Sequence, residues 1–551
     1  MRKALLSVYD KRGLIKLGKF LKSKDIDIIS SNKTANLLNI SDVSCTEISD
    51  YINHAEILDG RVKTLHPKIY GGILNDRNNR NHQNDLKNNG ISNIGIVVVN
   101  LYPFKKYNCI DNIDIGGVSL IRAAAKNYKD VLVIVDPDDY EYVIENYNDI
   151  SSVYDDKMRK HFASKAFHHI AKYDILIANY LDKSIENNSN NIKYKIYKKM
   201  DKLKYGCNPH QNNSNIYMNI LENNNTTNDY EHKLPFEILN GKPGYINYLD
   251  AINSWQLVKE TKDILNIPIS TSFKHVAPAG VGTSKPLTEM LKHTYGVENK
   301  DLTDVATSYI RAKNSDPLSS YGDFIAISDI VDECTAELIK NHVSDGIIAP
   351  GYSLEALKIL REKKNGNFIV LLAKKKYKEN IFVEFRELNG IVLSQETNSI
   401  IMDNSVFKKD KIVTNNKNLD EDIIDDMILA NMTLKYTPSN SITFAYNGQV
   451  IGIGAGQQNR VDCVKIAGNK VRNWLLRQNK NKPLNEELEY PDMVMASDAF
   501  FPFKDNIEEA KKFGVKYITQ PGGSIRDNEV IEECNKKNMV MLNTGIRLFT
   551  H

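Results

Sequence analysis

The chain has 551 residues, more than one hydrophobic core organises, so we expect at least two domains. Its 72 lysines and arginines almost balance its 69 aspartates and glutamates, and the net charge of +3 argues against a nucleic-acid partner. Hydrophobic residues make up 41% of the chain and charged residues 26%, as in ordinary globular proteins.

The cysteine pattern and the apolar runs indicate the cellular setting. The six cysteines are scattered, without a CxxC pair or a Cys/His spacing suited to zinc, which favours a reducing compartment and no transition metal. The first apolar run, Ala4 to Val8, is too short for a signal peptide. No run approaches the roughly 18 residues of a membrane span. We therefore expect a soluble, cytoplasmic protein without membrane contact.

Residues 1–180 alternate between strand-like and helix-like segments. Short continuous apolar runs separated by helices are typical of a parallel α/β sheet, in which ligands bind beyond the carboxyl ends of the strands. The pattern predicts strands at 3–9, 26–30, 93–104 and 131–140, and helices at 11–24 and 118–128.

The remaining chain again mixes helices and strands, without a repeat of fixed period. A polar stretch at 185–202 is our candidate linker, and the Asn/Lys-rich segments 222–233 and 477–492 are predicted surface insertions. In "SITFAYNGQVIGIGAG", Asn447-Gly448 between two β-rich runs predicts a hairpin.

Four N-terminal motifs predict an anion site. "SVYDKRG" and "SSNKTA" follow the first two expected strands, "DGRVKTLHPK" is rich in cations, and Gly116-Gly117 opens the helix of "NIDIGGVSLIRAAAKN". Free N–H groups at a helix start, with cations nearby, bind phosphate. A solvated basic loop and a plain turn are the alternatives for the last two motifs.

A dinucleotide site is not favoured. No GxGxxG follows the first strand, and the glycines at 452, 454 and 456 form only GxGxG. No Walker motif is present either.

In "SFKHVAPAG", Lys274-His275 follows the strand-like run 264–273 and precedes a predicted turn at Pro278–Gly280. Histidine accepts a proton near neutral pH, and a neighbouring ammonium stabilises a developing oxyanion, which suits attack by an amine on a carbonyl. A solvated surface pair is the alternative. The residues alone therefore indicate a two-domain enzyme that acts on anionic substrates.

Taken in order from "LLSVYDK" to the terminal "RLFTH", the motifs resemble the bifunctional AICAR formyltransferase/IMP cyclohydrolase family over nearly the whole chain. The most specific are "GRVKTLHPKIYGGIL", "NLYPF", "IDIGGVSLIRAAAKN", "YGCNPHQ", "SFKHVAPAG" and "SDAFFPF". The resemblance implies an α/β fold. Its N-terminal domain, residues 1–196, would be a methylglyoxal-synthase-like parallel sheet. Residues 197–551 would form a transformylase region of two cytidine-deaminase-like α/β subdomains.

For the N-terminal domain, the resemblance implies dehydrative closure of formyl-AICAR to IMP. The carboxamide nitrogen attacks the formyl carbon and water leaves. Lys126 would be the proton donor and acceptor, with Lys63, Tyr102 and Asp114 lining the reacting end. The other implied nucleotide contacts are Tyr9, Asp10, Lys11, Ser31, Asn32, Lys33, Thr34, Arg61, Val62, Thr64, Asn100 and Ile115.

For the C-terminal region, the resemblance implies formyl transfer from 10-formyltetrahydrofolate to the 5-amino group of AICAR. His275 would be the base, Lys274 would stabilise the oxyanion or protonate the leaving nitrogen, and Asn440 would orient the transition state. The implied AICAR contacts are Lys204, Tyr205, Asn247, Gly322, Asp345, Arg460, Phe500 and Arg547, with Arg547 on the phosphate. The implied folate contacts are Val461, Asp505, Ser524 and Ile525.

The resemblance also implies a homodimer, because two subunits share the transformylase site in this family. A structural monovalent cation is a further candidate, and no transition-metal site is expected. The partners would be the small molecules AICAR, formyl-AICAR, IMP and folate.

Three positions depart from the family pattern. Ser31-Asn32-Lys33-Thr34 stands where Ser-Gly-Gly-Thr is usual. If the loop needs a positive φ, Asn32 tolerates it moderately and Lys33 poorly. Lys204 replaces the usual arginine and loses a two-pronged hydrogen bond, so we expect weaker AICAR binding. Tyr9 replaces a smaller polar residue. The alternatives are a transformylase with an impaired cyclohydrolase site and a non-catalytic nucleotide-binding protein.

Overall fold

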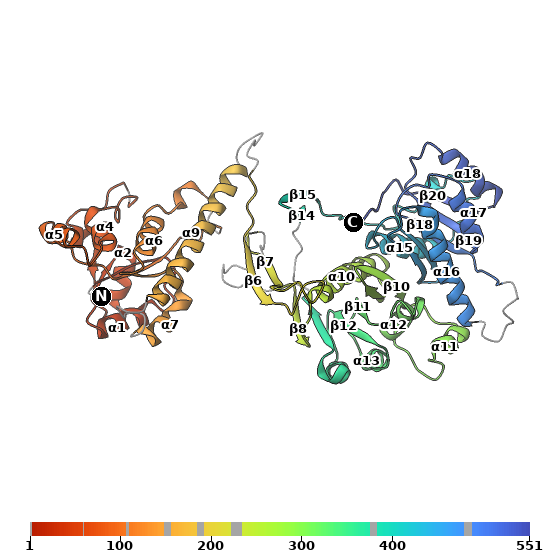
Figure 1. Ribbon diagram of the computed structural model, residues 1–551, viewed down its shortest axis with the longest axis horizontal. Helices are drawn as coiled ribbons and strands as arrows, with labels where there is room; N and C mark the ends of the chain where they lie inside the picture. The colour runs from red at the N-terminus through yellow and green to blue at the C-terminus, as the bar shows by residue number, and fades with distance from the viewer. Residues whose placement is uncertain are drawn as a thin grey trace. The chain divides into compact units, whose positions relative to one another are not determined.

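The structure is a computed structural model that describes residues 3–58, 60–105, 109–147, 156–183, 192–221, 234–374, 383–478 and 488–551. The chain divides into two compact units, Met1–Ile196 and Tyr197–His551, which are described separately (Figure 1). Among the described helices, none is long and apolar enough to cross a membrane.

The first unit is built on a five-stranded parallel sheet of order β3-β2-β1-β4-β5. Its strands are β1 (Lys3–Val8), β2 (Asp27–Ser30), β3 (Thr46–Glu47), β4 (Ile96–Asn100) and β5 (Leu132–Ile134). The helices are α1 (Leu14–Ser23), α2 (Asn32–Ile40), α3 (Ile48–Ile52), α4 (Pro67–Leu74), α5 (Arg80–Asn88), η1 (Ile110–Asn112), α6 (Gly116–Lys126), η2 (Pro137–Asp139), α7 (Tyr140–Glu145) and α9 (Lys157–Lys183).

This sheet is buried on both faces, as the continuous apolar runs predict. Along β1, Leu5 belongs to one hydrophobic cluster, and Ala4 and Leu6 belong to another, because successive side chains of a strand point to opposite faces. The predicted parallel α/β architecture is confirmed. The strand order reverses between β1 and β4, which is where such sheets bind ligands.

The second unit contains an eleven-stranded mixed sheet of order β20-β19-β18-β16-β17-β10-β9-β11-β12-β13-β8. Its strands are β8 (Phe236–Asn240), β9 (Ile269–Lys274), β10 (Ala277–Thr283), β11 (Asp323–Ile327), β12 (Ser344–Ala349), β13 (Ile369–Ala373), β16 (Ile442–Tyr446), β17 (Gln449–Gly454), β18 (Met493–Ser497), β19 (Val515–Gln520) and β20 (Val540–Asn543). The helices are α10 (Tyr245–Leu265), α11 (Glu289–Tyr295), α12 (Asp304–Ser315), α13 (Glu333–Lys340), α14 (Leu354–Glu362), η3 (Lys363–Gly366), η4 (Lys409–Lys411), α15 (Glu421–Lys435), α16 (Arg460–Gln478), α17 (Asp505–Lys511) and α18 (Asp527–Lys536).

Two separate ribbons complete the unit. β6 (Tyr197–Lys202) pairs with β7 (Asn215–Asn219), and β14 (Val383–Leu388) pairs with β15 (Ile391–Glu396). The linker prediction for 185–202 is therefore wrong at its end, where β6 is fixed by its antiparallel pairing. Its residues 185–191 lie outside the described residues, as do the predicted insertion 222–233 and residues 479–487 of the insertion 477–492.

The second unit consists of two halves with the same order of elements. Each half has a long helix (α10 or α15), an antiparallel hairpin (β9–β10 or β16–β17), a covering helix (α12 or α16) and three neighbouring parallel strands (β11 to β13 or β18 to β20). The halves join where β10 and β17 pair antiparallel, Val281 opposite Val450 and Gly282 opposite Gln449. The repeat has no fixed period in the sequence because the connecting segments differ in length.

The two hairpin turns test the local predictions. Asn447-Gly448 forms the expected turn, with φ of 47° and 75°. The turn predicted at Pro278–Gly280 is wrong, because the chain reverses at His275-Val276 and Pro278 lies inside β10. A register shift between Pro278 and Gly280 accommodates the proline, which has no N–H to donate.

Glycine pairs let a helix approach the second strand of each hairpin. A Cβ on Gly282 of β10 would lie 2.5 Å from Arg311 Cβ of α12, and one on Gly454 of β17 would lie 2.1 Å from the Cys463 carbonyl oxygen of α16. The GxGxG glycines at 452 and 454 therefore serve helix packing, in agreement with the exclusion of a dinucleotide site.

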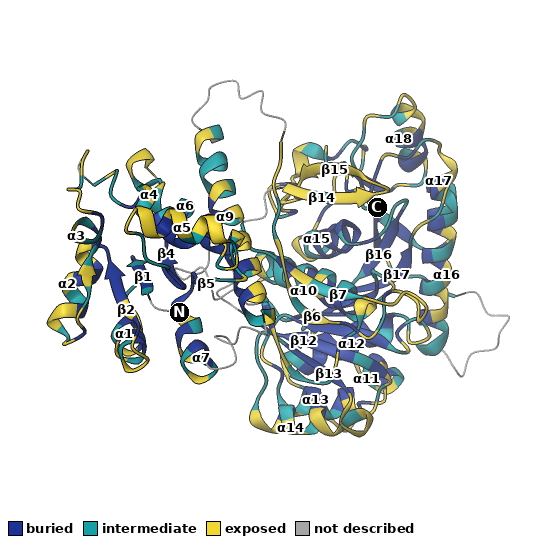
Figure 2. Cartoon of the chain, turned by 60° about the vertical axis from the view of Figure 1, so that its left-hand side comes forward, coloured by how far each residue is buried: buried dark blue, intermediate teal, exposed yellow. Residues whose placement is uncertain are grey.

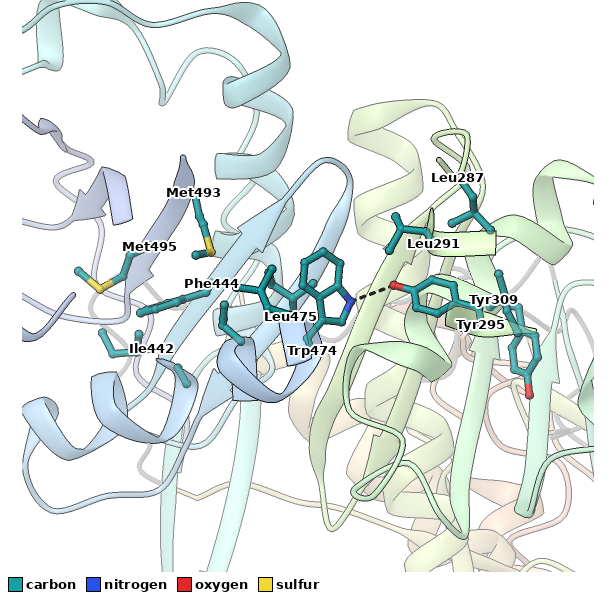
Figure 3. Packing of buried hydrophobic residues seen from close by; sticks show 14 of the residues in the cluster. Leu287, Leu291, Tyr295, Tyr309, Ile442, Phe444, Trp474, Leu475, Met493 and Met495 are labelled. Atoms are coloured by element: carbon teal, nitrogen blue, oxygen red, sulfur yellow. Dashed lines mark hydrogen bonds between the residues drawn. The ribbon is translucent and has the colours of Figure 1, made fainter. Parts of the chain in front are cut away.

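A buried polar network ties the two halves together near their junction. Trp474 Nε1 donates to Tyr295 Oη at 2.9 Å (Figure 3), and Tyr295 Oη donates to Gln449 Oε1 at 3.0 Å. Gln449 Nε2 in turn donates to the Arg311 carbonyl oxygen at 2.7 Å. Burial raises the pKa of Tyr295, so its hydroxyl stays neutral and serves as donor and acceptor.

We expect Gly454→Ala to destabilise the second unit by about 1–3 kcal/mol, because the added methyl group meets rigid helix backbone. Calorimetric unfolding of the full chain measures this change. Ala455→Ser, at the neighbouring half-buried position, is the control and should unfold like the parent. Parent-like unfolding of Gly454→Ala would contradict the packing argument.

Candidate active sites

In the first unit, the Asn100 side chain shapes the loop at the point where the strand order reverses. Asn100 Oδ1 accepts the N–H groups of Tyr9 at 2.6 Å and Asp10 at 2.8 Å, and Asn100 Nδ2 donates to the Asp10 carbonyl oxygen at 3.0 Å. The rings of Tyr9 and Tyr102, 5.1 Å apart between centroids, lie above the ends of β1 and β4. The structure thus brings these four predicted residues together.

A cationic corner lies beside this loop, at the start of α2. Lys11 Nζ donates to the Val8 carbonyl oxygen at 2.7 Å and to Thr34 Oγ1 at 3.3 Å. Burial lowers the pKa of Lys11, and the nearby charge of Lys33 lowers it further. The Ser31 hydroxyl bonds Ser7 Oγ at 3.2 Å and does not cap the helix. Two ammonium groups therefore stand at a helix start, as a phosphate site requires.

The unusual Asn32-Lys33 pair fits the backbone without strain. Both residues lie in the first turn of α2, and neither has a positive φ. Their side chains are exposed. The conformational reason for glycine does not apply here, and Lys33 instead adds a charge beside Lys11.

Asp114 organises the start of α6. Its Oδ1 accepts the Gly117 N–H at 2.6 Å, and its own N–H donates to Tyr173 Oη at 2.7 Å. Burial raises the pKa of Asp114, while the Gly117 hydrogen bond and the charge of Lys63 lower it. This carboxyl group can therefore exchange a proton nearer to neutral pH than an exposed aspartate can.

Close backbone approach brings the Lys63 loop to the same place. A Cβ on Gly116 would lie 2.6 Å from Thr64 Oγ1, so a larger residue would force the Thr64 side chain to move. Val62 forms a bridge to Ile57, Arg61 pairs with exposed Asp111 at 2.9 Å, and Ile115 is exposed.

Lys126 is not brought to this cluster. It is the last residue of α6, and the helix runs against the strands, so Lys126 lies about 15 Å from Gly116, toward the amino ends of the strands. Lys63, Asp114 and Tyr102 lie toward the carboxyl ends.

Two tyrosines near Asp114 were missed by sequence reasoning. Tyr70 Oη shares a 2.5 Å hydrogen bond with Ser119 Oγ, and burial and the Asp114 charge raise its pKa, whereas the Ser119 bond lowers it. Tyr173 comes from α9, 59 residues after Asp114, and no motif marks it.

In the second unit, strand directions bring the predicted residues of the large sheet to one edge. β9 ends, and β11, β12 and β16 begin, where β17 to β20 end. We call this the His275 edge. It carries Lys274 at the end of β9 and His275 after it, Gly322 before β11, Asp345 at the start of β12, Asn440 before β16, Arg460 and Val461 after β17, Phe500 and Asp505 after β18, Ser524 and Ile525 after β19, and Arg547 after β20.

His275 and Asn440 are the two polar catalytic candidates on this edge. His275 is exposed at the β9–β10 turn, and Asn440 stands before β16. β10 and β17 lie between β9 and β16, so His275 and Asn440 stand at separate places along the edge.

A buried ion pair supports the Lys274 side of the edge. Lys313 Nζ bonds Asp323 Oδ1 at 2.7 Å, and Ser272 Oγ donates to Asp323 Oδ2 at 2.5 Å. Burial lowers the pKa of Lys313, the charge of Asp323 raises it, and Lys274 lowers it further. Lys274 Nζ donates to the Tyr321 carbonyl oxygen at 2.6 Å, next to Gly322 with its φ of 74°.

A second buried pair holds Asn440. Arg460 forms a buried ion pair with Asp498, and Arg460 Nη2 donates to Asn440 Oδ1 at 2.9 Å. Asn440 Nδ2 donates to the Gln457 carbonyl oxygen at 2.9 Å. Asn440 is thereby fixed at both ends of its amide.

The C-terminal segment lies against this cluster. Leu548 N–H donates to the Asp498 carbonyl oxygen at 2.9 Å, and Ser439 N–H donates to the Thr550 carbonyl oxygen at 3.0 Å. The exposed guanidinium of Arg547, just before Leu548, lies 4.8 Å from the Phe549 ring centroid.

The remaining AICAR candidates are less tightly joined to the edge. Asn247 Oδ1 accepts the Gly244 N–H at 2.9 Å at the start of α10, and Asp345 pairs with Lys364 at 2.6 Å. Lys204 Nζ lies 5.6 Å from the Tyr205 ring centroid, in the loop after β6. Leu203 beside them shares a hydrophobic cluster with Tyr248 of α10.

Exposed apolar side chains accompany the folate candidate Ile525. Phe500 and Phe503 are partly exposed, and Ile525 is fully exposed. The Arg526 guanidinium lies 4.8 Å from the Phe503 ring centroid. Phe503 belongs to the "SDAFFPF" motif but was not among the contacts expected from the sequence.

Two family models match the chain. Residues 124–470 match the family model of the AICARFT/IMPCHase bienzyme, and residues 13–134 match that of the MGS-like domain, which confirms the expected N-terminal fold.

Full-length relatives are also found among curated proteins. The bifunctional purine biosynthesis proteins PurH of Acetivibrio thermocellus, Clostridium kluyveri and Caldicellulosiruptor saccharolyticus are 36%, 37% and 36% identical, each over 100% of both chains. A solved structure, the crystal structure of ForH, is 28% identical and covers 33% of this chain and 98% of its own, with a TM-score of 0.30. On the family match and the full-length relatives, the chain belongs to the AICARFT/IMPCHase bienzyme family, the bifunctional enzymes of purine biosynthesis.

Proposed function

We propose that the unit Tyr197–His551 transfers the formyl group and that the unit Met1–Ile196 closes the purine ring. One observation carries this division. The Lys274-His275 pair and the Asn440–Arg460 cluster stand on one sheet edge of the second unit, whereas Lys63 and Asp114 meet at the start of α6 in the first. The cytidine-deaminase-like character of the two halves stays a prediction.

In the transfer, the 5-amino nitrogen of AICAR attacks the formyl carbon of 10-formyltetrahydrofolate. His275 takes the proton that leaves the amine, and the ammonium of Lys274 stabilises the oxyanion of the tetrahedral intermediate. Lys274 keeps two N–H donors for this task, because the Tyr321 carbonyl uses one. The bond from the formyl carbon to N10 then breaks, N10 takes up a proton, and formyl-AICAR and tetrahydrofolate result.

The Asn440–Arg460 cluster, in the second half of the unit, would orient the substrates. The amide of Asn440 is held by Arg460 and by the Gln457 carbonyl, so it meets the transition state without reorganising. Arg547 presents an exposed guanidinium suited to the AICAR phosphate. The folate would lie against Phe503, Ile525 and the other candidate folate contacts.

In the ring closure, the carboxamide nitrogen of formyl-AICAR attacks its formyl carbon, and the formyl oxygen leaves as water. Asp114, with its raised pKa, suits proton transfer to or from the reacting groups, and Lys63 would stabilise the negative charge that develops on oxygen. Lys11 and Lys33 would bind the phosphate. The role of Lys126 stays a prediction, because this residue stands at the far end of α6.

A homodimer is part of the proposal. β14 and β15 form a ribbon whose strands, among the described residues, pair only with each other, and Figure 2 shows this ribbon almost wholly exposed. Its apolar side chains Leu388, Ile391, Val392 and Leu393 are 48–65% exposed. Apolar surface of this kind favours association, and a second copy of the chain would cover it.

A structural monovalent cation and a cytoplasmic location also stay proposals. Ser441 Oγ is buried without a hydrogen-bond partner in the described chain, and the Ser441 N–H donates to Asp498 Oδ2 at 3.0 Å. A free hydroxyl oxygen beside a carboxylate suits a hard monovalent cation such as K⁺.

We expect the purified protein, given AICAR and 10-formyltetrahydrofolate, to release both tetrahydrofolate and IMP. His275→Ala should lower tetrahydrofolate release by about 10²-fold or more, yet still convert supplied formyl-AICAR to IMP at the parent rate. Tetrahydrofolate release with accumulating formyl-AICAR would indicate an impaired cyclohydrolase. AICAR binding without either product would favour a non-catalytic binding protein.

We expect Lys63→Ala to slow ring closure of supplied formyl-AICAR by about 10²-fold, because it removes the charge next to Asp114. Lys126→Ala should change this rate much less, since its side chain lies at the other end of α6. The rate of IMP formation measures both variants, and tetrahydrofolate release is the control. An equal loss in the two variants would support the proton-transfer role of Lys126 and contradict our assignment.

We expect Lys33→Gln to raise the KM for formyl-AICAR about two- to fivefold at low salt, with kcat unchanged, because one exposed charge beside the phosphate is lost. The difference should shrink as ionic strength rises. Lys33→Gly, which restores the family residue, should behave like Lys33→Gln. A lower KM in Lys33→Gly would show instead that close backbone approach matters more than charge.

A further inference from the structure

His275 stands in a turn that its sequence does not favour. Lys274 and Ala277 pair across the β9–β10 hairpin, so only His275 and Val276 make the reversal, with φ of 56° and 60°. Two-residue turns with both φ positive favour Asn-Gly, and a β-branched residue such as Val276 adopts this region only under strain. A contact from outside the turn therefore has to stabilise this conformation.

The carboxylate of Asp250 meets the turn from α10. Asp250 is 5% exposed, and its Oδ1 accepts the Val276 N–H at 2.7 Å. Burial raises the pKa of Asp250, and hydrogen bonds from the N–H groups of Val276 and His275, with the charge of His275, lower it. The other charge acting on it is Asp345, which raises it. One buried carboxylate therefore binds the Val276 N–H of the turn and also interacts with His275 beside it.

The second half of the sheet contains the same device without strain. There, Asp426 of α15 accepts the N–H groups of Asn447 and Gly448, each at 2.7 Å, at the β16–β17 turn. Asn-Gly adopts the two positive φ values readily, so this turn needs less support. It lies at the edge opposite the His275 edge, because β16 begins at the His275 edge and its turn follows its other end. Substituting each aspartate in turn therefore compares the loss of its support at a strained turn with the same loss at a relaxed turn.

We propose that Asp250 is a positioning residue for formyl transfer. Its carboxylate holds both residues of the turn in the left-handed region, and this conformation presents His275 together with Lys274 at the sheet edge. This inference rests on the proposed role of His275 as the base. A charge-assisted hydrogen bond is stronger than one to a neutral acceptor, so an amide in place of the carboxylate holds the turn less firmly.

The test compares Asp250→Asn with Asp426→Asn in the full-length protein. Asp250→Asn should lower kcat for tetrahydrofolate release about 10- to 100-fold, with little change in the KM for AICAR, because a misplaced base affects the transition state more than binding. Asp426→Asn should leave kcat near the parent value, even if it lowers the melting temperature. IMP formation from supplied formyl-AICAR should be unchanged in both.

Val276→Gly provides a rescue that a merely structural role would not give. Glycine adopts a positive φ without strain, so adding Val276→Gly to Asp250→Asn should restore much of the lost kcat. If Asp250→Asn alone does not fold, the double variant is compared with Val276→Gly alone, and equal kcat values are then expected.

Three outcomes would overturn the inference. The first is a parent-like kcat in Asp250→Asn, and the second is an equal loss of kcat in Asp426→Asn. The third is a double variant whose kcat is no higher than that of Asp250→Asn. If Asp250→Asn does not fold, the third outcome is a double variant whose kcat is lower than that of Val276→Gly. Failure of the proposed function is distinguishable from these, because the parent protein itself would then release no tetrahydrofolate.

Discussion

The pairing of β10 with β17 is the interaction on which the second unit depends. Only two residue pairs define its register, yet it joins a five-stranded and a six-stranded arrangement into one sheet and fixes which strand ends share an edge. The buried network of Trp474, Tyr295, Gln449 and Arg311 spans the same junction. Because the pairing is antiparallel, the hairpin turn of one half and the carboxyl strand ends of the other arrive side by side.

Buried ion pairs then fix the groups that stand on this edge. Lys313–Asp323 lies beneath the segment that binds Lys274, and Arg460–Asp498 lies beneath Asn440. A buried charge pair is costly unless its remaining hydrogen bonds are satisfied, and each pair uses those bonds to hold backbone or amide groups near the edge. The first unit achieves a similar fixation with the neutral side chain of Asn100.

Much of this could be predicted from the sequence, because local patterns determine it. The parallel sheet followed from its apolar runs, and the Asn447-Gly448 hairpin followed from its turn residues. The His275-Val276 turn could not be predicted, since its conformation depends on Asp250, 25 residues earlier on another element. The buried pairs and Tyr173 share this difficulty, because only the tertiary fold brings their partners together. The position of Lys126 required the direction of α6, which motif spacing alone does not give.

Because of the antiparallel junction, the partial charges of helix ends also differ between the two halves of the His275 edge. In the half that follows α15, the helices α16, α17 and α18 all begin at this edge, whereas α12, α13 and α14 of the other half end there. Helix starts carry partial positive charge and helix ends partial negative charge. The part of the edge formed by the second half is therefore the more favourable for anionic groups, and it carries Arg547, the proposed phosphate contact. In the proposed mechanism, this polarity favours one direction of substrate binding, with the reacting amine at the hairpin turn.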